Sequence, residues 1–118
     1  MAKTAKEPED FLPLTVTEFH IMLVLADDDL HGYGIMQTIE EQTNGVITMG
    51  PGTLYTTIKR LLERGWIQET EPPAHADDPR RKYYTLTAFG NRVVSAEARR
   101  IAASVETARS LGLLGGTS

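Results

Sequence analysis

Residues 49–67 read MGPGTLYTTIKRLLERGWI and predict one complete short helix with two unlike faces. Gly50 suits the N-cap, Pro51 the first helical position, and Gly65 the left-handed residue that follows the last turn. Apolar side chains recur at the spacing of one helix face, at Leu54, Ile58, Leu61 and Leu62. Threonines and an arginine occupy the other face, at Thr53, Thr56, Thr57 and Arg60, with Tyr55 and Lys59 beside them.

That polar face suits nucleic acid. Small hydroxyl side chains near the start of a helix allow a close approach to a groove, and cations one turn later reach phosphates or base edges. An ordinary amphipathic surface helix accounts for the same pattern, so the rest of the chain has to separate the two interpretations.

The composition is that of one globular domain. The chain has 118 residues, of which 41% are hydrophobic and 24% charged. It has no cysteine, so it forms neither disulfides nor thiolate metal sites. No apolar run reaches the length of a membrane span, and residues 1–15 lack the apolar core of a signal peptide. We therefore expect a cytoplasmic protein that does not enter a membrane and needs no cofactor.

The net charge of −4 is unusual for a protein that binds nucleic acid, but it is unevenly distributed. Residues 1–50 carry two cations and nine acids, whereas residues 51–92 carry seven cations and five acids. The cations are concentrated in the half that contains the candidate helix. Local charge governs docking more than the total does, although the acidic half should weaken non-specific binding.

Two further helices are predicted before the candidate helix. Residues 1–10 are polar and predict a flexible tail. Thr15 and Glu18 form a capping-box pattern that opens a helix ending near residue 26, and a second helix is expected over 33–43. In the first helix Ile21 and Leu25 lie off the main apolar face, which suggests a second partner. The β-branched run 46–48 predicts a short strand.

After the candidate helix the pattern changes to a hairpin. Residues 66–71 and 82–87 are predicted strands, and the prolines and aspartates of residues 72–81 exclude regular structure between them. Three helices followed by a hairpin with a long tip is the winged helix-turn-helix order, in which the third helix reads DNA and the hairpin is the wing. The expected fold is mainly α with a small β-hairpin, and its DNA-binding domain spans residues 11–87.

A last helix is predicted over residues 88–111, with residues 112–118 as a disordered end. Its apolar seam has a near-heptad spacing and consists of Val94, Ala98, Ile101, Val105 and Ala108. A helix of about 24 residues is roughly 36 Å long, which is more than a small winged core can cover. We expect a second copy to cover the seam and form a homodimer; the alternative is that the helix folds back on the first helix of its own chain.

Three segments together resemble the PadR-type transcriptional regulators. They are His31-Gly32-Tyr33-Gly34-Ile35, then Gly52-Thr53-Leu54-Tyr55 with Lys59-Arg60-Leu61 and residues 63–67, and finally Arg80-Arg81-Lys82-Tyr83-Tyr84 running into Leu86-Thr87 and Gly90. They occur in the family's order and span about two thirds of the chain. The short last helix resembles the subgroup that has no large C-terminal domain.

The resemblance implies a homodimeric repressor that binds double-stranded DNA at an inverted repeat and is released by a small molecule. By position it implies DNA contacts from the third helix at Thr53, Tyr55, Thr56, Thr57, Lys59 and Arg60. The wing would contribute Arg80, Arg81 and Lys82.

The last helix departs from the multidrug-sensing members of this family, which carry a drug-stacking tryptophan there. From residue 88 onward Phe89 is the only aromatic side chain, and the single tryptophan is Trp66. We therefore expect any pocket at the dimer centre to take a small apolar effector, lined by Ile21, Leu25, Ala98 and Ile101. A solid hydrophobic interface without an effector is the alternative.

Other classes of function have little support. The three histidines are not spaced as metal ligands, no glycine-rich phosphate loop is complete, and no serine or cysteine nucleophile pattern occurs, so neither a metal site nor an enzyme is expected. The remaining rival is a winged-helix module that binds another protein without binding an operator. The acidic first half favours this rival, and the cationic reader helix and wing tip favour DNA.

Overall fold

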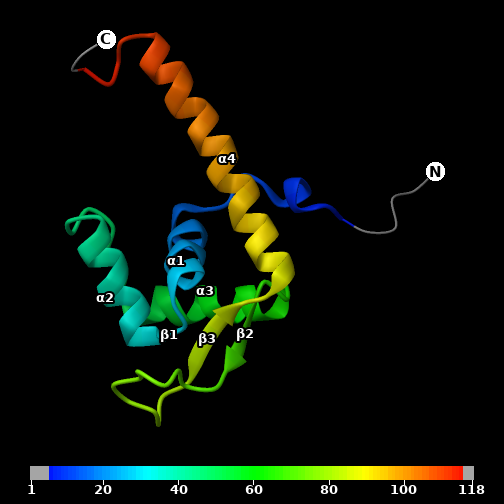
Figure 1. The fold of residues 1–118 in the computed structure, drawn as a ribbon, viewed down its shortest axis with the longest axis vertical. Helices are drawn as coiled ribbons and strands as arrows, with labels where there is room; N and C mark the ends of the chain where they lie inside the picture. The colour runs from blue at the N-terminus through cyan, green and yellow to red at the C-terminus, as the bar shows by residue number, and fades with distance from the viewer. Residues whose placement is uncertain (1–5, 116–118) are drawn as a thin grey trace.

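Four α-helices and a three-stranded antiparallel sheet make up the computed structural model, which describes residues 6–115 (Figure 1). In chain order the elements are the 3-10 helix η1 (Pro8–Phe11), α1 (Val16–Asp27), β1 (Leu30–His31), α2 (Gly32–Gln42), α3 (Pro51–Glu63), β2 (Ile67–Thr70), β3 (Tyr83–Leu86) and α4 (Ala88–Ser110). The predicted class, mainly α with a small β-hairpin, is confirmed.

The capping signals in the sequence mark the helix starts correctly. The Thr15 hydroxyl accepts the Glu18 backbone N–H at 3.0 Å, and the Glu18 carboxylate accepts the Thr15 N–H at 3.0 Å. Gly50 is the N-cap of α3, and Gly65 has a φ of +75° directly after this helix. Each of these signals is local, so tertiary packing does not need to be known to interpret it.

The sheet contains one strand that was not predicted. β3 lies in the centre, paired with β2 on one side and with the two-residue β1 on the other, where Leu30 faces Tyr84 and His31 faces Tyr83. The strand expected at 46–48 is wrong. These residues form no strand, and Val46 is 80% exposed. A strand of two residues is too short to show the alternation of apolar and polar residues that marks a strand in a sequence. β1 can therefore be recognised only from its pairing with the edge of β3.

α1 is the central helix, and its burial corrects the expectation for Ile21 and Leu25. It packs against α2, α3, α4 and β3, and only the face that carries Val16 and Leu23 stays exposed (Figure 1). Ile21 is 0% and Leu25 4% exposed, both within the core of a single chain. The prediction that these two side chains line an effector pocket between subunits is therefore wrong.

The segment before α1 is ordered from residue 6 onward and seals the core. Pro8 is buried in η1, and Phe11 packs edge-on against Trp66 at 5.2 Å and against Phe89 at 6.0 Å between ring centroids. The flexible tail expected over 1–10 is thus wrong for residues 8–10, because Phe11 ties them to the core. Residues 1–5 lie outside the described residues. At the other end residues 111–114 form a turn, and 116–118 lie outside the described range.

α4 has two unlike halves. Residues 88–97 pack on η1, α1 and β3, and they bury Val93, Val94, Ala96 and Glu97. Residues 98–110 extend beyond the core and are all exposed or half-buried (Figure 1). Val94 is 4% exposed within its own chain, so its assignment to a seam between subunits is wrong. Ala98, Ile101, Val105 and Ala108 lie on the extending half, where nothing in the described chain covers them fully.

Candidate nucleic-acid interface

The outward face of α3 carries most of the residues that the sequence places there. Thr53, Thr56 and Lys59 are exposed, and Tyr55 is 49% exposed. Thr57 is the exception: it is 3% exposed, and its hydroxyl donates to the Thr53 carbonyl at 2.8 Å. Its assignment as a DNA-facing residue is wrong, because position 57 lies at the edge of the buried stripe, beside Leu54 and Leu61 on the helix.

The Tyr55 side chain of α3 lies against the start of α2. A Cβ atom on Gly32 would lie 2.3 Å from the Tyr55 hydroxyl oxygen, so only glycine permits this approach. Gly32 and Tyr55 together with His31, Arg81, Lys82 and Tyr84 surround a hollow of about 330 Å³. The Tyr55 phenol therefore sits between α3, the start of α2 and the strand β3.

Arg60 is exposed only in part, because a buried carboxylate holds it. Its Nε donates to Glu18 Oε2 at 3.0 Å, and Arg64 Nη1 donates to the same oxygen at 3.1 Å. Glu18 is 4% exposed and was not predicted as a site residue, because its capping role already explained its presence. Burial raises the pKa of the Glu18 carboxyl, but the Thr15 N–H and the two guanidinium groups outweigh burial and leave the pKa below its ordinary value.

The wing cations are all present on the surface, and each has an acidic neighbour. Asp78 accepts from Arg80 Nε at 3.4 Å and from Arg81 Nε at 3.1 Å, while Lys82 Nζ lies 3.7 Å from Glu69. A backbone hydrogen bond from Arg80, together with the Arg81 guanidinium, lowers the pKa of Asp78. These pairs are solvent-exposed and hold weakly, so the cations stay available to an outside anion.

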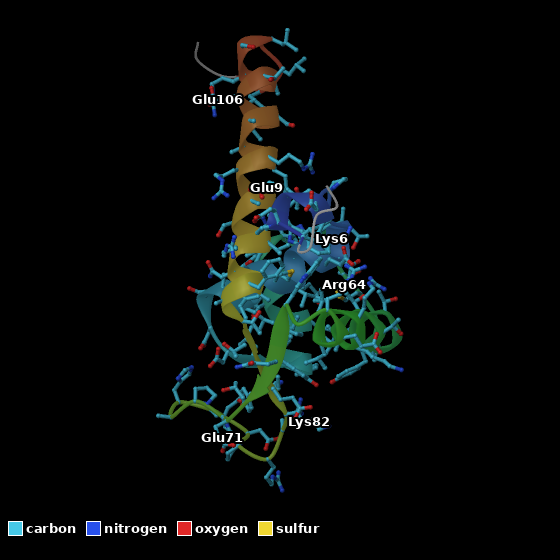
Figure 2. All side chains as sticks on the ribbon, turned by 90° about the vertical axis from the view of Figure 1, so that its right-hand side faces the viewer. Lys6, Glu9, Arg64, Glu71, Lys82 and Glu106 are labelled. Carbon is cyan, nitrogen blue, oxygen red and sulfur yellow. The ribbon has the colours of Figure 1, made fainter. Side chains whose placement is uncertain are left out.

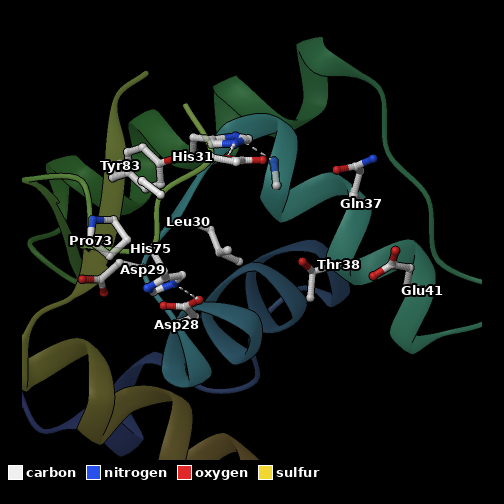
Figure 3. Close-up of a pocket in the computed structure, with 13 residues that line it drawn as sticks. Asp28, Asp29, Leu30, His31, Gln37, Thr38, Glu41, Pro73, His75 and Tyr83 are labelled. Carbon is white, nitrogen blue, oxygen red and sulfur yellow. Dashed lines mark hydrogen bonds and ion pairs between the residues drawn. The ribbon is translucent and has the colours of Figure 1, made fainter. Parts of the chain in front are cut away.

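The loop between β2 and β3 is fastened to the segment between α1 and α2 around a cavity of about 340 Å³ (Figure 3). His75 Nε2 lies 3.0 Å from Asp28 Oδ2, and His31 Nε2 lies 3.6 Å from Asp77 Oδ1. His31 Nδ1 accepts the Gly34 N–H at 2.9 Å, which places the imidazole proton of the neutral ring on Nε2. These contacts orient the wing; among residues 6–115 no three acids or histidines are placed to hold a metal ion.

The wing and the extending half of α4 lie at opposite ends of the molecule. Figure 2 shows Lys82 and Glu71 on the wing at one end and Glu106 near the far end of α4 at the other. Past the core, α4 and its closing turn expose a series of apolar side chains, Val105 at 40%, Leu111 at 67%, Leu113 at 71% and Leu114 at 50%.

In the described part of the chain no helix is both long and apolar enough to cross a membrane.

Comparison with known proteins agrees with this geometry. The pattern of the family described as the transcriptional regulator PadR-like family matches residues 21–96. An uncharacterized protein X of Lysinibacillus sphaericus is 32% identical over 75 residues, which are 64% of this chain and 68% of that protein. The transcriptional regulator YqjI of Escherichia coli is 40% identical over 47 residues, 40% of this chain but only 23% of that regulator's length.

The architecture matches solved structures as well. The crystal structure of a PadR-like transcriptional regulator from Bacillus cereus superposes with a TM-score of 0.68 at 20% identity, over 86% of this chain and 94% of that one. At this identity the likeness establishes the fold, a winged helix with a long C-terminal helix, and not the ligand.

Proposed function

Because the chain belongs to the PadR-like family of transcriptional regulators, we propose that it binds an inverted-repeat operator as a homodimer and represses transcription until a small apolar molecule releases it. Membership of this family makes the chain a DNA-binding regulator and not an enzyme. The dimer, the operator symmetry, the repression, the effector and a cytoplasmic location are the finer parts of the proposal.

One observation carries the proposal above all others. The exposed face of α3 presents hydroxyl and cationic side chains, Thr53, Thr56 and Lys59, and has no acidic residue between Gly52 and Leu62. Among the described residues Lys59 has no ion pair or hydrogen bond, so its ammonium group is available to a phosphate. In this assignment α3 enters the major groove, and Tyr55 together with Arg80, Arg81 and Lys82 contacts the flanking backbone.

The dimer rests on the extending half of α4. Ala98, Ile101, Val105 and Ala108 recur with heptad spacing on one face, and a second copy of this half-helix covers them with matching side chains. The small side chain of Ala98 beside Ile101 leaves room in the seam for an apolar effector. Movement of one subunit against the other would then change the separation of the two reader helices and lower operator affinity.

The rival function, a winged-helix module that binds a protein, is supported by the acidic first half of the chain. The way in which binding affinity changes with ionic strength distinguishes the two functions. Binding that depends on phosphate contacts falls steeply as salt rises, whereas an apolar protein interface does not.

The test is a gel shift of the full chain with DNA from upstream of its own gene that contains an inverted repeat. We expect a shift that survives excess random duplex and weakens steeply between 50 and about 200 mM salt. Equal affinity for the repeat and for random DNA of the same length would overturn operator recognition.

A further inference from the structure

A hydroxyl-lined groove lies between the start of α1 and the exposed face of α3. It has a volume of about 610 Å³ and contains no acidic side chain in its wall. Its lining consists of Thr15, Thr17, Gly52, Thr53, Thr56, Thr57 and Arg60. Threonines from two helices and one guanidinium thus surround a space that opens beside the residues expected to read DNA.

The guanidinium of Arg60 is anchored along one edge. Its Nε is engaged by the buried Glu18 carboxylate at 3.0 Å, and among the described residues neither Nη atom makes a hydrogen bond. Glu18 is itself fixed, because its other oxygen accepts the Thr15 N–H at the start of α1. Arginine has five N–H donors in a rigid fork, so fastening the Nε edge leaves the four Nη donors for an anion.

This anchoring also limits how far Arg60 reaches. A side chain drawn back to a carboxylate between α1 and α3 does not extend to the floor of a major groove, where a bidentate guanine contact requires it. An anion at the rim, bound by the Nη donors and by threonine hydroxyls, fits both the position and the donor set. Phosphodiester oxygens are such acceptors, and guanidinium groups bind them with geometric selectivity.

We propose that the groove between α1 and α3 holds one backbone phosphate of the bound duplex, contacted by Arg60 and the hydroxyls of Thr17 and Thr53, while Thr56 faces the bases. Glu18 acts as a positioning residue for Arg60. This inference rests on the proposed function, which it deepens by assigning Arg60 to the DNA backbone and leaving base reading to the other exposed residues of α3.

Arg64 supplies a matched control. It donates to the same Glu18 oxygen and is exposed to a similar extent, with 40% of its side chain accessible against 38% for Arg60. However, Arg64 does not line the groove, and its guanidinium carbon lies 4.8 Å from the centre of the Trp66 ring. Loss of Arg64 therefore removes an equivalent ion pair to Glu18 and an equal charge without changing the lining of the groove.

The experiment measures the affinity of full-length Arg60→Gln and Arg64→Gln for the selected operator and for random duplex, by fluorescence anisotropy across salt concentrations. For Arg60→Gln we expect weaker binding of both duplexes by the same factor and a salt slope smaller by about 1. Arg64→Gln should change neither quantity. Thermal unfolding of each variant checks that the fold is retained.

A second pair tests the positioning role of Glu18. Glu18→Gln removes a negative charge beside DNA, which by itself would strengthen binding. If Glu18 positions Arg60, the variant instead binds several-fold more weakly, and this weakening disappears when Arg60 is already glutamine.

Three outcomes overturn the inference in distinguishable ways. A loss confined to the operator, with random duplex unaffected, would make Arg60 a base-reading residue. Equal effects of Arg60→Gln and Arg64→Gln would mean that only total charge matters. If the unmodified chain fails to bind duplex even at low salt, the proposed function fails together with the groove.

Discussion

Glu97 links α4 to the segment that precedes α1, and its loss should destabilise the protein strongly. It is 1% exposed on α4, and its Oε2 accepts the Leu14 backbone N–H at 2.8 Å. Arg100 donates to both carboxylate oxygens, from Nε at 2.5 Å and from Nη2 at 3.1 Å. The substitution Glu97→Ala leaves the Leu14 N–H without an acceptor in a buried position and opens a gap beside it.

The size of the loss follows from these contacts. A hydrogen bond to a charged group contributes about 1.5–3 kcal/mol, and leaving its buried donor unpaired costs a similar amount. The Arg100 pair adds less than about 1 kcal/mol, because 46% of its side chain is exposed. We expect a loss of about 2–4 kcal/mol in the free energy of unfolding, which lowers Tm by roughly 8–15 °C in a domain of this size.

The dependence on pH gives an independent check. Hydrogen bonds from Arg100 and from the Leu14 N–H lower the pKa of Glu97 despite its burial. The carboxylate therefore adds stability above its unfolded pKa of about 4.5, and this stability is lost as pH falls through the lower folded pKa. The difference in Tm between the unmodified chain and Glu97→Ala should shrink in that acid range.

The assay is thermal unfolding followed by circular dichroism between pH 3 and pH 7, at fixed protein concentration. Glu106→Ala is the control on the same helix, because Glu106 pairs with Arg109 at 3.2 Å but is 71% exposed. The control should shift stability by less than about 0.5 kcal/mol. Equal shifts for the two variants at pH 7 would refute the reasoning.

Three further predictions concern the dimer, the start of α2 and the reader helix. Val105→Glu places a charge in the exposed seam of α4 and should yield monomers by analytical ultracentrifugation, whereas Ala103→Glu, on the opposite face, should leave the dimer intact. Gly32→Ala would bring a methyl group to within 2.3 Å of the Tyr55 hydroxyl oxygen, but the half-exposed ring can move aside, so we expect a loss below about 1 kcal/mol in chemical denaturation; a loss of about 3 kcal/mol or more would show that the ring cannot move. Thr56→Val should alter preference among operator variants in a competition assay, while Thr57→Val should not, since its hydroxyl is buried within α3.

What the sequence predicts well in this chain is local. Thr15, His31, Gly50 and Thr87 all cap helices, and three of the four starts follow from capping chemistry or from a proline at the first position. Trp66, which follows the glycine after α3, is 1% exposed and packs where that helix turns into β2. These features depend on residues within one or two turns of each other, so a single sequence contains the necessary information.

What the sequence misses depends on contacts between distant segments. β1 exists because β3 has a second edge to pair, and η1 is ordered because Phe11 reaches Trp66 and Phe89. Val94 has the spacing of a seam residue, but the first half of α4 lies against α1 and buries it. Periodicity identifies an apolar face without identifying what covers it.

The candidate site shows the same division. The outward direction of Thr53, Thr56 and Lys59 follows from helical periodicity, and the wing cations follow from their place at the hairpin tip. The carboxylate partners do not follow, because Glu18 is 42 residues from Arg60 in the chain. Only the packing of α1 on α3 reveals that Arg60 is tied back.

The most direct test of the central claim is a hydroxyl-radical footprint of the full chain on its selected operator, with the number of chains bound per duplex measured in parallel. A dimer that uses one α3 helix per half-site predicts two chains per duplex. Their two protected regions should be related by two-fold symmetry, with centres about 34 Å apart or a multiple of that distance. A single protected region with one chain bound would contradict the account.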